Sequence, residues 1–489
     1  MIKRVLAFDL GASTGRCILG EFKDGKLRLE EISRFSYEPI MIDQKMHWDI
    51  DLIFTSITTA IKTAIDRYHI DSLAIDTWGV DYGLLDEQGD LIEAPVHYRD
   101  SRTRGMLAEI AKVIPHSRLY EMTGIQLMEI NTLFQLKATA LQEPEKLART
   151  ETLLLMPDLL GYFLTGTKKT EMSIASTSQL LNPITKNWNQ ELLMQIDLPC
   201  HIFTDIVTEG NVLGKIKPSL QLTEISVHHV CAHDTASAFA SAAGEEDSFF
   251  VSSGTWSLIG VERTSPIINE KAKNYNLTNE SGINGTTRLL KNMTGLWIVQ
   301  ELKREFAERG QDYSYSKLET LARAAQPFQF FIDTEDPRFL TSGKMIERIY
   351  GFLQESKQEI PETDGELIRC VYESLAFKYK TAFLEIMDVV GKSLTTINMV
   401  GGGTQSKLLC EMVSNASGME VTAGPVEATA LGNIGVQLMS HGCFESISQM
   451  RLWIRELTDI KIYNPVDIND WQNEFQRYNT LITSTKLRK

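Results

Sequence analysis

The chain has 489 residues, of which 43% are hydrophobic and 23% charged, so a disordered or fibrous protein is excluded and more than one domain is expected. Its 49 Lys and Arg residues are outnumbered by 64 Asp and Glu residues, which gives a formal net charge of −15. This acidity argues against nonspecific nucleic-acid binding, which needs clustered basic side chains. Taken alone, it also argues against a highly anionic ligand.

The N-terminus and the cysteines indicate the compartment in which the protein works. The first apolar run is too short for a signal peptide and is interrupted by Asp9, and no stretch approaches the roughly 18 apolar residues of a membrane span. The six cysteines are scattered and form no Cys-x-x-Cys pair, so they do not indicate a metal or redox centre. We therefore expect a cytoplasmic protein without a membrane partner.

The start of the chain predicts a small antiparallel sheet, a helix and a buried strand. Residues 11–15 are small and turn-forming, and Asp24-Gly25 is a hairpin signal. Apolar residues between positions 53 and 68 recur at helical spacing. The predicted elements are strands at 4–10, 16–22 and 27–35, a helix at 53–68 and a strand at 73–77.

The middle of the chain has a different character. Residues 101–222 are predicted to be mostly helical, and a β-rich run follows at 225–231. A helix rich in Ala and Ser is expected at 236–243. The polar turn after this helix marks the expected boundary between two domains, 1–243 and 244–489.

The opening pattern returns at the start of the second domain. Residues 248–251 and 256–261 predict strands on either side of the small polar turn 252–255. The later predicted elements are a helix at 365–390, a strand at 396–400 and a helix at 405–417. Because a strand, a small turn and a second strand open each half, we expect two structurally related halves.

Three small-residue turns could bind phosphate. Over residues 11–14 and 252–255, small side chains let backbone N–H groups approach an anion closely, and hydroxyls can add hydrogen bonds. The glycine run 401–403 allows the same approach, and residues 424–433 could form a second wall of that pocket. The alternatives are ordinary hairpins and a tight strand-to-helix turn. Asp9, just before the first turn, could hold Mg²⁺ directly or through water.

Two further motifs suit a proton acceptor and a sugar. Asp234, between His233 and Thr235, could be a general base that takes a proton from a substrate hydroxyl, or a helix N-cap. The stretch 76–81 combines two carboxylates with a tryptophan and a glycine, which suits the hydroxyl edges and apolar faces of a sugar. Residues 98–103 could add polar contacts, or could form a solvated surface network.

In this order and spacing, the motifs resemble those of the FGGY carbohydrate kinases, members of the actin-like, sugar kinase and Hsp70 ATPase superfamily. The likeness covers nearly the whole chain and is closest to the members that act on L-rhamnulose. The motifs that carry it lie at 9–16, 75–81, 98–103, 233–238, 252–258, 290–297, 401–403 and 424–435. The resemblance implies an α/β fold of two ribonuclease-H-like (actin-like ATPase) domains with a nucleotide cleft between them. The first domain would bind the sugar and the second the nucleotide.

The resemblance also implies a role for each residue that matches a family motif. Asp234 would be the catalytic proton acceptor, and Asp9 would lie near Mg²⁺. The sugar would contact Gly79, His233, Asp234, Thr235 and Asn292. ATP would contact Ala12, Ser13, Thr14, Gly15, Arg16, Thr255, Gln300 and Gly402.

The implied reaction is transfer of the ATP γ-phosphoryl group to the 1-hydroxyl of L-rhamnulose, in a monomer or small homo-oligomer. The alternatives are a family kinase for another ketose such as L-fuculose or xylulose, a non-catalytic sugar or nucleotide sensor, and an actin-like filament or chaperone ATPase. The net charge does not oppose ATP binding, because residues 10–15 and 248–260 contain no charged side chain. Backbone dipoles and Mg²⁺, rather than a basic field, would then balance the phosphate charge.

Overall fold

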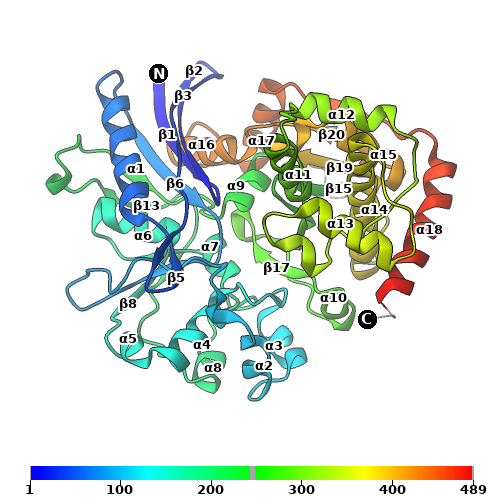
Figure 1. Cartoon of the computed structure of the whole chain (residues 1–489). Coiled ribbons are helices and arrows are strands. Elements are labelled where there is room, and N and C mark those ends of the chain that lie inside the picture. The colour runs from blue at the N-terminus through cyan, green and yellow to red at the C-terminus, as the bar shows by residue number, and fades with distance from the viewer. Residues whose placement is uncertain (1, 243–247, 487–489) are drawn as a thin grey trace. The chain divides into compact units, whose positions relative to one another are not determined.

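The computed structural model describes residues 2–242 and 248–486 (Figure 1). The chain forms two compact units and contributes more than one segment to each. The first unit contains Met1–Ala243, Glu262–Leu289 and Ala428–Leu457, and the second contains Gly244–Val261, Leu290–Glu427 and Thr458–Lys489. The polar turn expected at 244–247 lies outside the described residues.

Most elements of the first unit come from the N-terminal half of the chain. Its strands are β1 (Ile2–Leu10), β2 (Thr14–Lys23), β3 (Lys26–Ser36), β4 (Ile40–Ile42), β5 (Lys45–His47), β6 (Ser72–Thr77), β7 (Tyr82–Leu85), β8 (Thr152–Leu155), β9 (Thr170–Glu171), β10 (Leu181–Asn182), β11 (Asn187–Trp188), β12 (Ile206–Val207), β13 (Val212–Lys215), β14 (Ser226–His228) and β17 (Thr278–Ser281). Its α-helices are α1 (Ile50–Ile65), α2 (Met106–Ala111), α3 (His116–Thr123), α4 (Thr132–Gln142), α5 (Pro144–Ala148), α6 (Met156–Thr165), α7 (Met172–Thr177), α8 (Gln190–Gln195), α9 (Asp234–Ser241), α10 (Glu270–Asn274), α16 (Ala428–Ser440) and α17 (Ile447–Leu457). Its 3₁₀ turns are η1 (Ser101–Thr103), η2 (Pro218–Leu220) and η3 (Ile283–Gly285).

A six-stranded mixed sheet forms the centre of the first unit, in the order β13-β14-β6-β1-β2-β3. Strand β1 runs antiparallel to β2 and parallel to β6, and β6 is also parallel to β14. The three-stranded start and the strand after the first helix are therefore confirmed. Because β1, β6 and β14 point the same way, the segments that follow them emerge at one edge of the sheet, where α/β proteins bind their ligands.

Alternation along β1 sends its side chains to two different helical layers. Phe8 and Leu10 belong to one hydrophobic cluster with Ile53 of α1. Val5 and Ala7 point to the opposite face, because successive strand residues do, and they pack in a second cluster with α9 and α16. In Figure 1, α1 and α16 flank these strands. Helices therefore cover both faces of the sheet around β1.

The prediction for the middle of the chain was only partly right. Residues 101–222 contain helices α2 to α8, but also the strands β8 to β13, each two to four residues long. The prediction of a mostly helical region is wrong for these strands, because so short a run shows no apolar periodicity. A separate hydrophobic cluster, which includes Phe134, Leu153 and Ile174, holds this region together.

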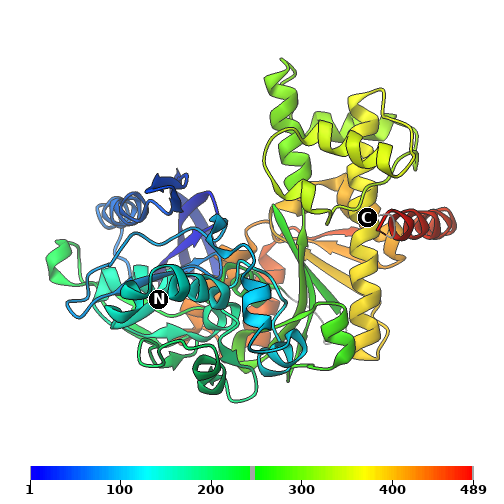
Figure 2. The ribbon, with the colours of Figure 1, turned by 60° about the horizontal axis from the view of Figure 1, so that its bottom comes forward.

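The second unit contains the later strands and the longest helix. Its elements are β15 (Ser248–Ser253), β16 (Trp256–Arg263), β18 (Thr287–Thr294), α11 (Trp297–Glu308), α12 (Tyr315–Ala324), η4 (Pro337–Leu340), α13 (Met345–Glu355), α14 (Asp364–Val390), β19 (Thr396–Val400), η5 (Gly402–Gln405), α15 (Lys407–Ser417), β20 (Glu420–Ala423), β21 (Lys461–Tyr463) and α18 (Ile468–Lys486). The long helix α14, yellow in Figure 2, packs with α12, α15 and α18. Among the described residues of both units, no helix combines the length and apolar character that a membrane crossing requires.

The strands of the second unit repeat the arrangement of the first. They follow the order β18-β16-β15-β19-β20-β21, in which β15 is antiparallel to β16 and parallel to β19. Strand β20 is parallel to β19, and β21 is antiparallel to β20. The order β3-β2-β1-β6-β14-β13 in the first unit has the same directions in these four pairs. The two related halves predicted from the repeated turn are therefore visible in the strand order.

Gly432 offers a test of the close contact between α9 and α16. A Cβ atom at this position would lie 1.8 Å from the backbone oxygen of Ser237, so Gly432→Ala must push the helices apart. We expect the variant to lose about 1–3 kcal/mol of unfolding free energy, seen as a lower urea midpoint. Gly351→Ala in α13 is the control, because its Cβ would meet only Arg338 Nη1, at 3.7 Å. An unchanged midpoint for Gly432→Ala would contradict this packing.

Candidate active site

The first small turn is fixed in place by the buried Tyr37. The N–H group of Gly11 donates to the carbonyl oxygen of Thr14 at 2.9 Å, and the Tyr37 hydroxyl donates to the Gly11 oxygen at 2.5 Å. The side chains at 12–14 are exposed, and any side chain at Gly15 would overlap a neighbouring aromatic ring. The turn is therefore held rigidly and presents only small side chains, as close approach to a phosphate requires.

Asp9 lies near the end of β1 and meets both neighbouring strands. In the sheet register it stands opposite Arg16 on β2 and beside Asp76 on β6. Arg16 Nη2 is 2.5 Å from Asp9 Oδ2, so the guanidinium neutralises this carboxylate. Two residues with predicted roles, one at ATP and one at Mg²⁺, are thus brought into direct contact.

Asp76 is a buried acid whose ionisation the sequence does not reveal. Asn433 Nδ2 donates to its Oδ2 at 2.7 Å, whereas Oδ1 has no partner within the described residues. Burial, together with the charges of Asp9 and Asp234, raises the pKa of Asp76 well above its usual range. Asp76 is therefore held towards its neutral form, and the three carboxyl groups share one neighbourhood of the first unit.

A divalent cation at this edge would have few protein ligands. Within the part of the chain that is described, no three His, Cys, Asp or Glu side chains are grouped so that they could hold a metal ion. Mg²⁺ commonly takes one or two carboxylates and completes its shell with water and substrate phosphates. The side chain of Asp9 is 12% exposed and fits that single-carboxylate role.

The predicted base, Asp234, is the first residue of α9. The N-cap position is taken by His233, so the interpretation of Asp234 as the N-cap is wrong. Asp234 Oδ1 accepts hydrogen bonds from the N–H group of Thr235 at 2.5 Å and from its hydroxyl at 3.0 Å. The side chain is 30% exposed, and no described residue donates to Oδ2. Thr235 thus engages one carboxylate oxygen of a side chain that is partly exposed.

His233 is oriented by a buried ion pair that the sequence analysis missed. Arg288, which is fully buried, donates from Nη2 to His233 Nδ1 at 3.2 Å and to Glu280 Oε2 at 3.2 Å. His233 Nδ1 also lies 3.4 Å from Glu280 Oε2, and His233 Nε2 lies 3.4 Å from Asp234 Oδ1, so the ring stands between the ion pair and the predicted base. Arg288 follows His233 by 55 residues, and no motif in the sequence signals the contact.

Asp81, within the predicted sugar-binding stretch, has a structural role. Its Oδ2 accepts hydrogen bonds from Trp48 Nε1 at 2.6 Å, Trp78 Nε1 at 3.0 Å and the N–H group of Tyr98 at 3.2 Å. Gln135 Nε2 donates to Oδ1 at 3.0 Å. This buried carboxylate therefore holds the side chains of Trp48 and Trp78 and the backbone of Tyr98, and it is not itself presented to a ligand.

The polar cluster at 98–103 supports this arrangement. Asp100 is buried and accepts hydrogen bonds from the N–H groups of Met46 and Arg102 at 2.9 Å each. Arg102 Nη2 in turn donates to Gln135 Oε1 at 2.8 Å. The surface-network interpretation is therefore wrong for Asp100.

The predicted nucleotide residues of the second unit also gather. Thr255 Oγ1 donates to Gln300 Oε1 at 3.2 Å. A Cβ at Gly403 would lie 2.0 Å from Ser253 Oγ, so this glycine is needed for a tight turn. A Cβ at Gly402 would have no neighbour within 4 Å, so the space beside this glycine is open. Asn292, predicted to contact the sugar, lies on β18 in the second unit.

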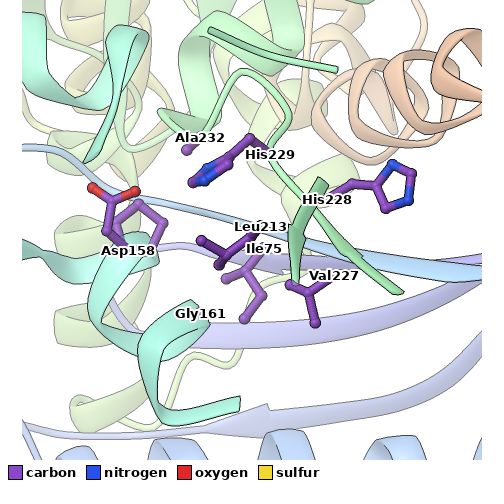
Figure 3. Close-up of a pocket in the computed structure, with 9 residues that line it drawn as sticks. Ile75, Asp158, Gly161, Leu213, Val227, His228, His229 and Ala232 are labelled. Carbon is purple, nitrogen blue, oxygen red and sulfur yellow. The ribbon is translucent and has the colours of Figure 1, made fainter. Parts of the chain in front are cut away.

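A small cavity lies beside the segment that precedes Asp234. Its volume is about 10 Å³, enough for about one water molecule, and Asp158, His229 and Ala232 help to line it (Figure 3). Asp158 Oδ2 and His229 Nε2 have no partner among the described residues. Burial raises the pKa of Asp158 well above its usual range and lowers the pKa of His229 to about 4, so both neutral forms are favoured. The cavity is too small for a sugar or a nucleotide.

Comparison with known proteins identifies the family. The model for the N-terminal domain of the FGGY family of carbohydrate kinases matches residues 4–240, and the model for the C-terminal domain matches residues 249–441. This chain belongs to the FGGY family of carbohydrate kinases. Within that family, the FGGY kinase is similar to the rhamnulokinase of Oceanobacillus iheyensis, with 39% identity over 94% of this chain and 98% of the relative. It is also 39% identical to the rhamnulokinase of Bacillus subtilis, over 95% of this chain and 96% of the relative.

Solved structures establish the fold of this FGGY kinase. The ligand-bound xylulose kinase from Lactobacillus acidophilus has a TM-score of 0.82 at 16% identity, over 100% of both chains. The gluconate kinase from the same organism has a TM-score of 0.82 at 15% identity, over 99% of this chain and 98% of that one. At these low identities the likeness concerns the fold alone. It confirms the predicted α/β, actin-like class, and membership of a sugar kinase family implies the use of ATP.

Asp81 makes the stability of the first unit depend on pH. Burial raises the pKa of its carboxyl from 3.8 to about 6 in the folded protein. Because the folded pKa is the higher one, the folded state binds the proton more tightly. Its stabilising contribution is complete below about pH 4 and is lost as the pH rises through 6.

Asp81→Asn removes the titrating group and keeps an acceptor for the two tryptophan side chains. We compare the free energy of unfolding of the natural protein with that of the variant. The difference, natural protein minus variant, should become smaller by up to about 3 kcal/mol between pH 4 and pH 7. Urea denaturation at several pH values measures this difference. A difference that stays constant over the range would contradict the buried, raised-pKa carboxyl.

Proposed function

We propose that this chain transfers the γ-phosphoryl group of ATP to the 1-hydroxyl of L-rhamnulose, giving L-rhamnulose 1-phosphate and ADP. The observation that carries the proposal is the 37–39% identity to proteins named rhamnulokinase over nearly the full length of both chains. Solved kinases named for xylulose, gluconate or glycerol are only 14–16% identical. This difference supports L-rhamnulose over another ketose.

Asp234 is the proton acceptor in this proposal. Its Oδ1 is engaged by Thr235, so Oδ2 is the oxygen that can receive a substrate proton. As the sugar hydroxyl oxygen bonds to the γ-phosphorus, its proton passes to Asp234. The bond from that phosphorus to the bridging oxygen of ADP breaks in line. His233, held by Arg288, lies beside the same carboxylate, with its Nε2 3.4 Å from Asp234 Oδ1.

The two substrates are bound by the residues that match the family motifs. Gly79, His233, Thr235 and Asn292 contact the sugar, while residues 12–16, Thr255, Gln300 and Gly402 contact ATP. The exposed small turn and the open space at Gly402 support this assignment. When bound, Mg²⁺ near Asp9 neutralises charge on the phosphoryl oxygens. Residues 1–243 act as the sugar-binding domain and 244–489 as the nucleotide-binding domain, in a cytoplasmic monomer or small homo-oligomer.

A comparison of ketoses tests the substrate. With ATP and Mg²⁺, we expect kcat/KM for L-rhamnulose to exceed the values for L-fuculose and D-xylulose by about tenfold or more, because misplaced hydroxyls leave polar groups of the site unpaired. Coupled detection of ADP measures the rates, and a reaction without sugar is the control. A higher value for another ketose would reassign the substrate. Equal ADP release without sugar would favour a filament or chaperone ATPase.

Asp234→Asn tests the role of the base. Asparagine is nearly isosteric but cannot accept the hydroxyl proton, so we expect kcat to fall about 10²-fold or more. Calorimetric titration should find sugar and ATP affinities close to those of the natural protein. Near-normal turnover in the variant would refute Asp234 as the base. If the natural protein also showed no turnover, a non-catalytic sensor would be favoured.

A further inference from the structure

Helix α7 is buried along its whole length although half of its side chains are polar. All six residues, Met172–Thr177, are buried, and Ser173, Ser176 and Thr177 each carry a hydroxyl. Buried polar groups cost free energy unless they are hydrogen-bonded, so their partners are informative. Each of these hydroxyls accepts a hydrogen bond from a backbone N–H group of another segment.

The N-terminal end of α7 holds the segment that leads to Asp234. Glu171, which is fully buried, accepts hydrogen bonds through Oε2 from the N–H groups of Ser173 and Ala232, at 2.9 and 3.0 Å. The Ser173 hydroxyl donates to the same oxygen at 2.6 Å and accepts from the N–H group of His233 at 3.2 Å. The two amides directly before Asp234 are thus held by α7 and its capping residue.

The segment before Asp234 also has contacts that do not involve α7. The carbonyl oxygen of Ala232 accepts from the N–H group of Thr77 at 2.9 Å, which fixes one side of the peptide. Ala232 also lines the small cavity of Figure 3, so packing there is incomplete. Arg288 holds the His233 ring and Ser237 Oγ donates to the carbonyl oxygen of Cys231 at 2.7 Å, whereas the amides of Ala232 and His233 are held by Glu171 and Ser173.

The C-terminal end of α7 holds the segment that carries Gly79. Thr177 Oγ1 accepts from the N–H group of Val80 at 3.1 Å and donates to the carbonyl oxygen of Ile174 at 2.8 Å. Val80 has a φ of 70°, a left-handed conformation that is strained for a β-branched residue. Such strain persists only where neighbours enforce it. Thr132 adds a second restraint, because its hydroxyl donates to the Val80 oxygen at 2.6 Å.

The middle of α7 reaches a third segment of the site. Ser176 Oγ accepts from the N–H group of Ser281 at 2.8 Å. Ser281 follows Glu280, which pairs with Arg288, and its own carbonyl oxygen accepts from Arg288 Nε at 3.1 Å. The hydrogen bond from Ser281 to Ser176 therefore supports the ion pair that orients His233.

We propose that α7 is a brace that sets the distance between the Gly79 segment and the base Asp234. Glu171, Ser173 and Thr177 are positioning residues for phosphorylation of the sugar. The inference rests on the proposed function, because that function gives Gly79, His233 and Asp234 their roles. A brace of this kind determines sugar binding and leaves nucleotide binding unaffected.

Thr177→Val is the first test, because valine keeps the shape of the side chain but cannot accept the Val80 amide. We expect KM for L-rhamnulose to rise about tenfold, with KM for ATP changed less than about twofold. Thr177→Ser, which restores the acceptor, should recover the natural value. If Thr177→Val leaves KM for the sugar unchanged, or raises both KM values equally, the brace is refuted.

Thr123→Val is the matched control. Like Thr177, Thr123 is a buried threonine at the last position of a helix. Its Oγ1 donates to the backbone oxygen of Leu119 and accepts from the backbone N–H group of Ile125. Among the described residues, the hydrogen-bond partners of the Thr123 side chain do not include the Gly79 or Asp234 segments. We expect both KM values of this variant to match the natural protein.

Hydrogen exchange of the ligand-free protein tests the brace without relying on activity. In Thr177→Val, the amide of Val80 should exchange faster, and so should those of Ala232 and His233 at the other end of α7. Ser173→Ala should have the reciprocal effect, and it serves as the second variant if Thr177→Val does not fold. Faster exchange only at the mutated end would overturn the brace. If exchange becomes faster at both ends of α7 but the natural protein does not phosphorylate L-rhamnulose, the brace stands and only the proposed function is refuted.

Discussion

Parallel pairing of β1 with β6, and of β6 with β14, delivers three separate chain segments to one edge of one sheet. The small turn that begins at Gly11, the stretch that contains Gly79 and the segment that leads to Asp234 all follow these strands. Register then sets the chemistry, because it places Asp9 beside Asp76 and opposite Arg16. In the second unit, parallel pairing of β15 with β19 brings together the turns near Thr255 and Gly402. Each half thus uses the same constraint to assemble distant residues.

Burial of acidic groups is the recurring cost of this arrangement. Asp76, Asp81 and Glu171 are all buried, and burial raises the pKa of each; the values for Asp81 and Glu171 are about 6 and 7. A stable core does not need such groups, since apolar replacements of similar size often serve as well. Each one instead accepts a hydrogen bond from a distant part of the chain, as Asp76 does from Asn433, Asp81 from Trp48 and Glu171 from Ala232. Stability is given up here for the placement of backbone and aromatic groups.

Sequence reasoning could predict the parts of this molecule whose signals are local. The strand-turn-strand starts, the amphipathic α1 and the run from β19 into α15 follow from periodicity and turn residues, and their repetition predicts two related halves. The contacts between Thr255 and Gln300 and between Asp9 and Arg16 were within reach of motif matching. The contacts of Arg288 with His233 and of Thr177 with Val80 were not, because they join residues 55 and 97 positions apart whose types are unremarkable. The short strands β8 to β13 were missed because pairing, and not local propensity, makes them strands.

The central claim, phosphoryl transfer to the 1-hydroxyl of L-rhamnulose, is tested most directly by the position of phosphate in the product. The natural protein would be incubated with ATP, Mg²⁺ and L-rhamnulose labelled with ¹³C at C1, and the product recorded by ¹³C and ³¹P NMR. Transfer to the 1-hydroxyl predicts that the labelled carbon becomes coupled to phosphorus as ADP accumulates. ADP formation without this coupling, or a coupling absent after complete conversion of ATP, would contradict the claim.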